Sequence, residues 1–415
     1  MGFRFKSLLG AAAISALIAA PASAAGLKAE VLHWWTSGGE SAAVKEFADA
    51  YTKAGGEWID TAIAGGPAAR AAGINRIVGG DPPTVMMFNI SNQFDDLVKQ
   101  GMLSNIDDVA AAEKWKDLVP AVIYNNVIRD GHVYAVPVNL HGQYWLFYNT
   151  DVMKKLGVEE PKTWDEFFAV LDKMKAGGLI PIAVSGAPNW IAGLFYAVMV
   201  RTVSPEGWNK FFKDKDLSVL NSADFKKAVE VFGRFRNYTD VGHATRNWPD
   251  STALVMTGKA GFQFMGDWAK GEFIAAKMTV GKEYNCTLGP GNKVFAMGGD
   301  NFVFPVNKDP ERVKAQKTIA KLMLSPEVQV AFNNKKGSVP IRPDVDTSKL
   351  DACAQTGIQA LNGKGTEKTV PTNQLLARPD LLGAYQDVIA KFWTTPTQTT
   401  DDFIKGIDAA IKANG

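Results

Sequence analysis

Aromatic and acidic side chains stand together where predicted strands end. Trp34 and Trp35 follow one predicted strand and precede Glu40, and Trp268 adjoins Asp267 after another. An aromatic ring offers a flat apolar face, and a carboxylate accepts strong hydrogen bonds from hydroxyl groups. The combination suits a polyhydroxylated ring such as a pyranose, which has an apolar C–H face and a rim of hydroxyls.

The two adjacent tryptophans do not have the same expected role. Neighbouring side chains on a strand point to opposite faces, so at most one of Trp34 and Trp35 faces a ligand if the strand continues through them. The other then packs in the core, which is the commoner place for any single tryptophan. Only the set of aromatic residues at strand ends, where open α/β sheets bind ligands, favours a binding site.

Composition narrows the classes of function. The 415 residues are 46% hydrophobic and 21% charged, as in a folded protein long enough for two lobes. Lys plus Arg is 45 and Asp plus Glu is 43, without a basic block, so no nucleic-acid partner is expected. The four histidines are scattered and form no pair at metal-ligand spacing, so neither a metal site nor a cofactor is predicted.

Predicted strands and helices alternate along the chain. Strands are expected at 28–35, 84–90, 133–138, 179–184, 259–265 and 301–306. Helices are expected at 41–53, 94–100, 163–175, 309–324, 375–393 and 401–412. This order predicts an α/β fold with mainly parallel sheets. No low-complexity linker divides the chain, which suggests that it crosses between two lobes more than once.

The N-terminal residues have the pattern of an export signal. Arg4 and Lys6 are followed by an apolar stretch at 8–20 and by small residues up to Ala24. The pattern predicts a signal peptide over 1–24, because the apolar stretch is too short to span a membrane. No cysteine follows for a lipid anchor, so the mature chain is expected to be soluble and exported.

Export bears on the two cysteines, Cys286 and Cys353. In an oxidising compartment two thiols pair, so a disulfide is expected. Two buried free thiols are the alternative.

Six stretches together resemble the extracellular solute-binding proteins of sugar ABC importers, and among them the glucose/galactose type. They are 32–40 (LHWWTSGGE), 79–83 (GGDPP), 135–141 (AVPVNLH), 162–167 (KTWDEF), 258–268 (GKAGFQFMGDW) and 336–338 (KGS). The two cysteines also stand where some relatives have a pair. Singly, KTWDEF occurs in sugar binders of any specificity, whereas the six stretches jointly are specific for the family.

The resemblance implies the two-lobe periplasmic-binding-protein fold, type II, similar to maltose-binding protein. The hinge crossings are expected near Val138, Met297 and Lys336. The N-terminal lobe is then made of 25–137 and 298–335, and the C-terminal lobe of 138–297 and 336–415. The lobes would close over a sugar held between them.

The resemblance also implies which residues contact the sugar. Trp34 or Trp35, together with Trp268, would provide the stacking surfaces, and Gly65 and Gly66 a close approach of the backbone. The proposed polar contacts are Glu40, Asn89, Asn139, His141, Asp300, Lys336 and Asn373. For Asn139 and His141, at the first crossing, a structural role in the hinge is an equal alternative.

Several positions depart from the glucose-type pattern. Met87 and Asn89 stand where relatives have a glutamine and a basic residue. The relatives' His-Arg-x-Asn at the first crossing is His-Gly-Gln-Tyr over 141–144 here, so an arginine is absent. Asn373 is the nearest polar residue to the position of a sugar-contacting histidine. A changed set of hydrogen-bonding groups implies a changed sugar, such as another monosaccharide, a glucoside or a small disaccharide.

The expected function is a monomeric, non-catalytic periplasmic receptor that delivers a sugar to a membrane permease of the ABC type. An exported glycoside hydrolase is the first alternative, since Glu40, Asp267 and Asp300 are candidate carboxylates. Hydrolysis requires two carboxylates on either side of the scissile bond, and no spacing singles out such a pair. A sugar sensor or lectin without a transport role is the second alternative.

Overall fold

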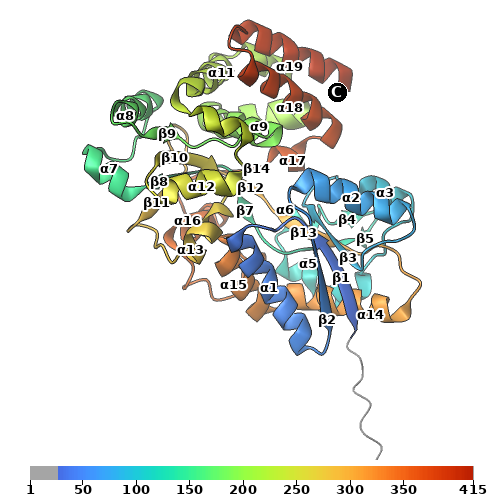
Figure 1. Ribbon diagram of the computed structural model, residues 1–415. Coiled ribbons are helices and arrows are strands. Elements are labelled where there is room, and N and C mark those ends of the chain that lie inside the picture. Colours follow the sequence, from blue (N-terminus) through green and yellow to red (C-terminus); the bar gives the residue numbers. More distant parts are fainter. Residues whose placement is uncertain (1–26, 415) are drawn as a thin grey trace, which may run out of the picture.

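The computed structural model describes residues 27–414, and its elements gather in two bodies around separate sheets (Figure 1). The predicted signal peptide over 1–24 lies outside the described residues. We call the body around the β2-β1-β3-β13-β6 sheet the first lobe, and the body around the β11-β8-β10-β9 sheet the second lobe. No helix of the described part is long and apolar enough to cross a membrane.

The first lobe has a mixed sheet. Its strands are β1 (Lys28–His33), β2 (Glu57–Ala62), β3 (Val85–Asn89), β6 (Ala135–Pro137) and β13 (Asp300–Val303). β1 is parallel to β2 and β3, whereas β13 is antiparallel to β3 and β6. The expectation of mainly parallel sheets is therefore wrong. Helical crossovers join β1, β2 and β3 and make them parallel, but β13 enters from the second lobe without such a crossover.

Four long helices complete the first lobe. They are α1 (Gly38–Lys53), α2 (Gly66–Val78), α14 (Pro310–Met323) and α15 (Pro326–Lys336). The helices α1 and α15 pack together through stacked Phe47 and Phe332 rings, whose centroids are 4.2 Å apart. Trp35 and Phe302 join the same aromatic cluster. The tight core holds the residue after β1 and the start of α1 in place.

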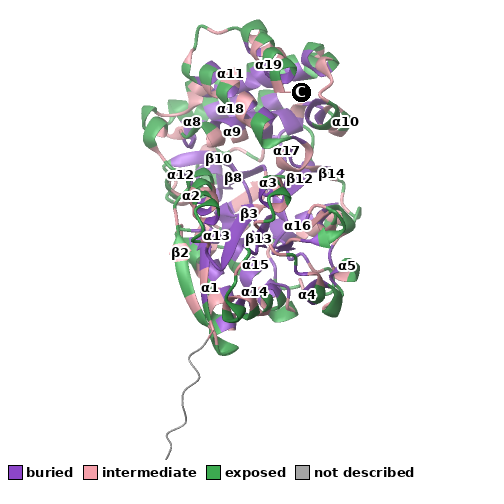
Figure 2. Cartoon of the chain, turned by 90° about the vertical axis from the view of Figure 1, so that its right-hand side faces the viewer, coloured by how far each residue is buried: buried purple, intermediate pink, exposed green. Residues whose placement is uncertain are grey.

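The second lobe surrounds a sheet that is also mixed. Its strands are β8 (Trp145–Asn149), β9 (Ile180–Ile182), β10 (Ala260–Met265) and β11 (Tyr284–Thr287). Its longer helices are α8 (Trp164–Ala176), α9 (Pro188–Thr202), α11 (Ala223–Phe235), α12 (Trp248–Met256), α18 (Pro379–Thr394) and α19 (Thr400–Asn414). Strand β8 is antiparallel to β10 and β11, while β9 is parallel to β10. Buried residues run through the sheets, and exposed residues gather on the outer faces of the helices (Figure 2).

A small sheet lies at the junction of the lobes, with β7 (His141–Gly142), β12 (Val294–Gly298) and β14 (Lys368–Pro371) in the order β14-β12-β7. The chain passes from β6 to β7 over 138–140, and from β12 to β13 at Gly299. It passes a third time after α15, where Val339 bridges Leu140. The remaining α-helices and strands of the described part are α3 (Asp95–Lys99), α4 (Asp107–Ala112), α5 (Trp115–Leu118), α6 (Ala121–Tyr124), β4 (Ile128–Arg129), β5 (His132–Val133), α7 (Thr150–Leu156), α10 (Pro205–Asn209), α13 (Ala269–Ala275), α16 (Ala352–Leu361) and α17 (Asn373–Leu376).

Two predicted element boundaries are wrong for identifiable reasons. The helix expected at 41–53 begins at Gly38, because Ser37 caps it and exchanges hydrogen bonds with Glu40. The helix expected at 375–393 is interrupted between Leu376 and Pro379, because proline disfavours a helical residue before it.

The disulfide between Cys286 and Cys353 is confirmed, with Cα atoms 6.3 Å apart. It joins β11 to α16. Neither cysteine lines the cavity between the lobes. The bond therefore restrains the second lobe without entering the candidate site.

Candidate ligand-binding cavity

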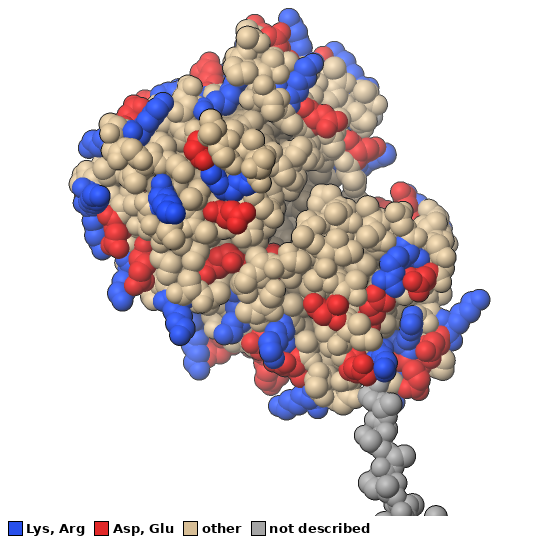
Figure 3. All heavy atoms as spheres, in the orientation of Figure 1, with Lys and Arg blue, Asp and Glu red and all other residues tan. Residues whose placement is uncertain are grey.

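A cavity of about 330 Å³ lies between the lobes. Figure 3 shows the molecule hollowed there, with few charged residues at the mouth on this face. The first lobe contributes the loops after β1 and β3, the start of α2, and the end of α15. The second lobe contributes α9, α12, α17, α18 and the loop after β10.

The cavity brings together almost all residues that the sequence singled out. Its lining includes Trp34, Trp35, Glu40, Gly65, Gly66, Asn89, His141, Trp268, Asp300, Lys336 and Asn373. Asn139 is the exception, since it is fully buried and does not line the cavity.

The two adjacent tryptophans differ in exposure. β1 ends at His33, so Trp34 and Trp35 lie in the loop that follows. Trp34 is half-buried, with the Arg70 guanidinium 5.4 Å from its ring centroid. Trp35 is 1% exposed and packs on the aromatic core of the first lobe. Its backbone N–H donates to His33 Nδ1 at 3.1 Å, which fixes the chain after β1.

Glu40 joins the start of α1 to the end of α15. Its Oε1 accepts a hydrogen bond from Lys336 Nζ at 3.0 Å, and both side chains are buried. The Lys336 ammonium also lies 5.5 Å from the Trp35 ring and 5.7 Å from the Trp268 ring. The ion pair thus lies between the Trp35 and Trp268 rings, and the two charges at the cavity neutralise each other.

Asp300 is the most connected acid of the cavity. Its Oδ1 accepts from Asn89 Nδ2 at 3.0 Å, and its Oδ2 faces Asn139 Nδ2 at 3.1 Å and His141 Nε2 at 2.8 Å. Asn139 Oδ1 also accepts from the Asp300 backbone N–H at 2.8 Å. Burial alone would raise the pKa of Asp300, but His141, Lys336 and Asn139 favour the charged form and the pKa is lowered. Asp300 is therefore a fixed carboxylate.

His141 lies between two carboxylates and is fully engaged. Its Nδ1 contacts Asp267 Oδ1, and its Nε2 contacts Asp300 Oδ2. Burial disfavours the imidazolium, but the two carboxylates outweigh burial and raise the pKa of His141 to about 9. Because both ring nitrogens are occupied, His141 holds Asp300 and Asp267 in position. The alternative of a structural role at the crossing fits both His141 and Asn139.

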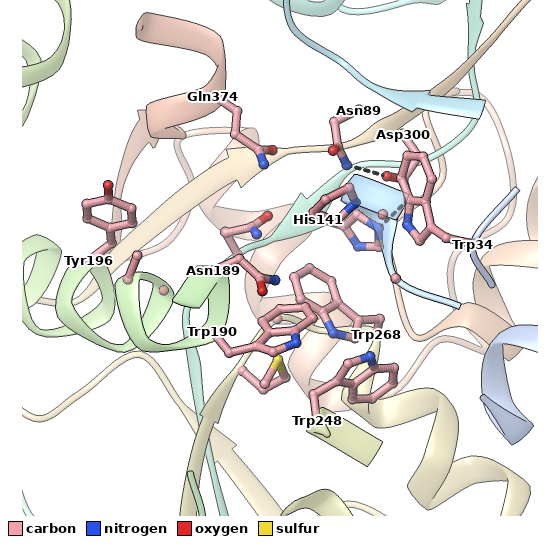
Figure 4. A pocket seen from close by; sticks show the side chains of 18 of the residues that line it. Trp34, Asn89, His141, Asn189, Trp190, Tyr196, Trp248, Trp268, Asp300 and Gln374 are labelled. Atoms are coloured by element: carbon pink, nitrogen blue, oxygen red, sulfur yellow. Dashed lines mark hydrogen bonds and ion pairs between the residues drawn. The ribbon is translucent and has the colours of Figure 1, made fainter. Parts of the chain in front are cut away.

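Three tryptophans form one wall of the cavity (Figure 4). The centroids of the Trp190 and Trp268 rings are 6.1 Å apart, and those of Trp190 and Trp248 are 6.5 Å apart. Trp268 also meets His141 edge to face at 5.1 Å. A Cβ on Gly266 would overlap the Trp268 ring at 2.1 Å, so glycine is required there. The wall offers an apolar surface beside the polar group around Asp300, which it meets at His141.

Arg70 and the polar residues of α17 add to the cavity. Arg70 Nη1 donates to Asn89 Oδ1 at 3.3 Å, and burial lowers the pKa of Arg70 to about 10. Asn373 Oδ1 accepts from the buried Tyr144 hydroxyl at 2.7 Å. Two amide side chains, Asn89 and Asn373, are thereby oriented by the protein before any ligand binds.

Several lining residues were missed from the sequence, among them Arg70, Asn189, Trp190, Trp248 and Gln374. A signal for the tryptophans does exist. Each follows an asparagine and adjoins or nearly adjoins a proline at the start of a helix, in Pro188-Asn-Trp190 and Asn247-Trp-Pro249. Both tryptophans stand at helix starts, whereas Trp34, Trp35 and Trp268 follow predicted strands. Arg70 carries no comparable signal, because it is an ordinary residue inside α2.

The family model for bacterial extracellular solute-binding proteins matches residues 43–355. The chain belongs to this family. A probable sugar-binding periplasmic protein of Rhizobium meliloti (strain 1021) is 38% identical over 369 residues, which are 88% of each chain. The xylose/arabinose-binding protein XacG of Haloferax volcanii is 26% identical over 370 residues, 86% of this chain and 78% of that protein.

Solved structures confirm the predicted fold class. The bacterial solute receptor AcbH, described with an exclusive preference for β-D-galactopyranose, superposes with a TM-score of 0.78. The two chains are 20% identical, with 93% of this chain and 98% of that chain covered. A maltose-bound MalE3 of T. maritima gives a TM-score of 0.75 at 18% identity, covering 93% and 99%. The chain has the two-lobe, maltose-binding-like fold of solute-binding proteins.

Proposed function

We propose that this protein is a periplasmic receptor that binds a neutral sugar between its two lobes and delivers it to an ABC permease. The observation that carries the proposal is that an aromatic wall and the fixed carboxylate of Asp300 line the same cavity. A pyranose ring stacks its C–H face on Trp268 and Trp190, and its hydroxyls donate to Asp300. The sugar-binding descriptions of the relatives support the same class of ligand.

The charges at the cavity favour a neutral ligand. Three cations balance three anions, namely Arg70, His141 and Lys336 against Glu40, Asp267 and Asp300. A charged ligand would bring into the cavity a charge that no protein group there balances, which costs on the order of 2–5 kcal/mol. A sugar with hydroxyls alone disturbs none of these pairs.

The carboxylates are also better suited to binding than to hydrolysis. Asp300 and Asp267 share one imidazolium, and Glu40 is paired with Lys336. A general acid requires a raised pKa, whereas the pKa of Asp300 is lowered. The homologous proteins are binding proteins. We therefore expect capture and release of an unchanged sugar.

We assign the N-terminal lobe to 25–137 and 298–335 and the C-terminal lobe to 138–297 and 336–415. The separate sheets and the junctions at 138–140, Gly299 and after Lys336 support this division. A sugar that contacts both lobes favours the closed arrangement, which is a shift of population toward that state. We expect the receptor to act as a monomer and to bind no nucleic acid.

The test is titration of the mature chain with neutral mono- and disaccharides, followed by tryptophan fluorescence and by chromatography of the sugar. Saturable binding without turnover is expected. Asp300→Asn should weaken binding about tenfold or more, because charge-assisted hydrogen bonds to hydroxyls are lost. Asp49→Asn, on the exposed face of α1, is the matched control. Turnover of a glycoside, or unchanged affinity in Asp300→Asn, would contradict the proposal.

A further inference from the structure

Two glycines inside helices stand out from all other described glycines. Gly193 in α9 and Gly383 in α18 have neither a positive φ nor any protein atom within 4 Å of the place where a Cβ would lie. Every other described glycine has a positive φ, or a protein atom within 4 Å of the place of its Cβ, or both. Glycine destabilises a helix interior, so a glycine required by neither conformation nor packing needs another explanation.

Both glycines line the cavity. They differ from Gly266 and Gly299, which also line it but where a Cβ would collide with protein atoms at 2.1 Å and 2.3 Å. Those two serve the packing of the protein itself. At Gly193 and Gly383 the space is open, so the missing side chains leave room inside the cavity.

The open space lies at one end of an elongated cavity. Along α9 the lining residues are spaced as one helical stripe, from Asn189 through Gly193 to Tyr196. The seven helical steps from Asn189 to Tyr196 rise about 10 Å, which is longer than one pyranose ring. Figure 4 shows Tyr196 on the opposite side of the view from Trp34 and Asp300, with Gln374 between them. The residues around Asp300 can therefore hold one ring and leave this end unfilled.

Helix α18 contributes a second stripe, with Leu382, Gly383 and Gln386, and it packs against α9. None of the lining residues on α9, α17 and α18 is charged, and the polar ones at this end include Asn189, Gln374 and Gln386. Amide side chains both donate and accept hydrogen bonds, as the hydroxyls of a neutral sugar do. Bare helix backbone at a glycine lets a flat ring approach closely.

We propose that the cavity holds two sugar rings end to end, so that the ligand is a neutral disaccharide or a longer saccharide. The first ring lies between the tryptophan wall and Asp300, and the second lies over Gly193 and Gly383, within reach of Gln374 and Gln386. This inference rests on the proposed function, since it names the size of the sugar that the same cavity takes.

Calorimetric titrations of the mature chain with glucose, galactose, maltose, cellobiose and lactose test this inference. At least one disaccharide should bind about tenfold or more tighter than either of its component monosaccharides. Gly193→Leu and Gly383→Leu, which fill the second-ring space, should each remove about tenfold of the disaccharide affinity. The affinity for the monosaccharide should change by less than about twofold, because the first ring lies elsewhere in the cavity.

Asp387→Leu places the same side chain on the exposed side of α18 and should leave both affinities unchanged. Melting temperatures report whether each variant is folded, and Gly193→Ala offers a smaller change at the same site. Equal losses of affinity for mono- and disaccharides would overturn the inference. The glycines would then leave room for the first lobe to close, and not for a second sugar ring. So would a wild-type chain that binds monosaccharides as tightly as disaccharides, although the proposed function would stand. Failure to bind any neutral sugar would refute both.

Discussion

Asp300, which we propose binds the sugar, is fixed by its protein neighbours. Its side chain contacts Asn89, Asn139 and His141, and its own backbone N–H is held by Asn139. A group fixed in this way loses little conformational freedom on binding, which improves affinity. Asn89, Asn139 and His141 therefore decide how well the proposed binding carboxylate is placed.

His141 makes stability depend on pH in a defined window. The imidazole pKa is about 6.5 in an unfolded chain and about 9 in this protein. Because the folded state binds the proton more tightly, this contribution is complete below pH 6.5. The contribution of His141 to the free energy of unfolding decreases between about pH 6.5 and 9 and is absent above that range, a loss on the order of 3 kcal/mol. Urea unfolding of the wild type at a series of pH values should show this decrease.

The variant His141→Gln isolates the effect. It keeps a hydrogen-bonding side chain at the junction but has no proton to lose in this range. It should be less stable than the wild type at pH 6, and its stability should change little between pH 6.5 and 9. Equal slopes for the two proteins in this window would show that His141 is not charged in the folded state.

The first turn of α1 is fixed by several contacts at once. Glu40 belongs both to the capping box of Ser37 and to the ion pair with Lys336. One residue earlier, Gly39 lies directly against Gly271 at the start of α13. Its N–H donates to Glu272 Oε1 at 2.8 Å, so the two lobes touch at this point. Cap, ion pair and contact between lobes all depend on one helical turn.

Adjacent glycines allow this contact to be tested. In Gly39→Ala the Cβ would lie 2.3 Å from the Gly271 backbone, whereas in Gly38→Ala it would meet only Glu272 Oε2 at 3.5 Å. Gly39→Ala should lower the free energy of unfolding by about 1–3 kcal/mol because α1 and α13 must separate. Gly38→Ala should be neutral, or stabilising by up to about 1 kcal/mol, because alanine favours the helix. Equal unfolding midpoints in urea would contradict the close packing.

The same turn shows what the sequence allows one to predict. Strand runs such as the one from Lys28 are evident from their apolar residues, and β1 begins where it was expected but ends at His33, two residues before the predicted end. Gly38 and Gly39 suggest a turn by composition, yet they begin a helix that Ser37 caps, and the lack of a Cβ at Gly39 serves a contact with α13 that is distant in sequence. For the same reason the mixed sheets were not predicted, since β13 pairs with β3 only after the chain has built the second lobe.

At the scale of the whole molecule, the candidate site forms because the chain returns to the first lobe after it has built most of the second. Trp34 and Asn89 come from the first pass through the first lobe, Trp190 and Trp268 from the second lobe, and Asp300 from the second pass. Family resemblance brought most of these positions together in the prediction, which periodicity alone did not. The residues of α9 and α18 that extend the cavity lay outside the recognised stretches. Their role depends on how two helices distant in sequence pack.

The disulfide acts at this same scale, because it ties β11 to α16 across 67 residues of chain. That loop contains β12 and β13 and the helices α14 and α15, so it leaves the second lobe and comes back. A cross-link of this span restricts the unfolded chain and is worth about 4 kcal/mol. The double variant Cys286→Ala, Cys353→Ala should lose about that much in urea unfolding. Sugar affinity should change less than about twofold, since neither cysteine lines the cavity. A large loss of affinity with little loss of stability would show that the bond instead sets the arrangement of the lobes.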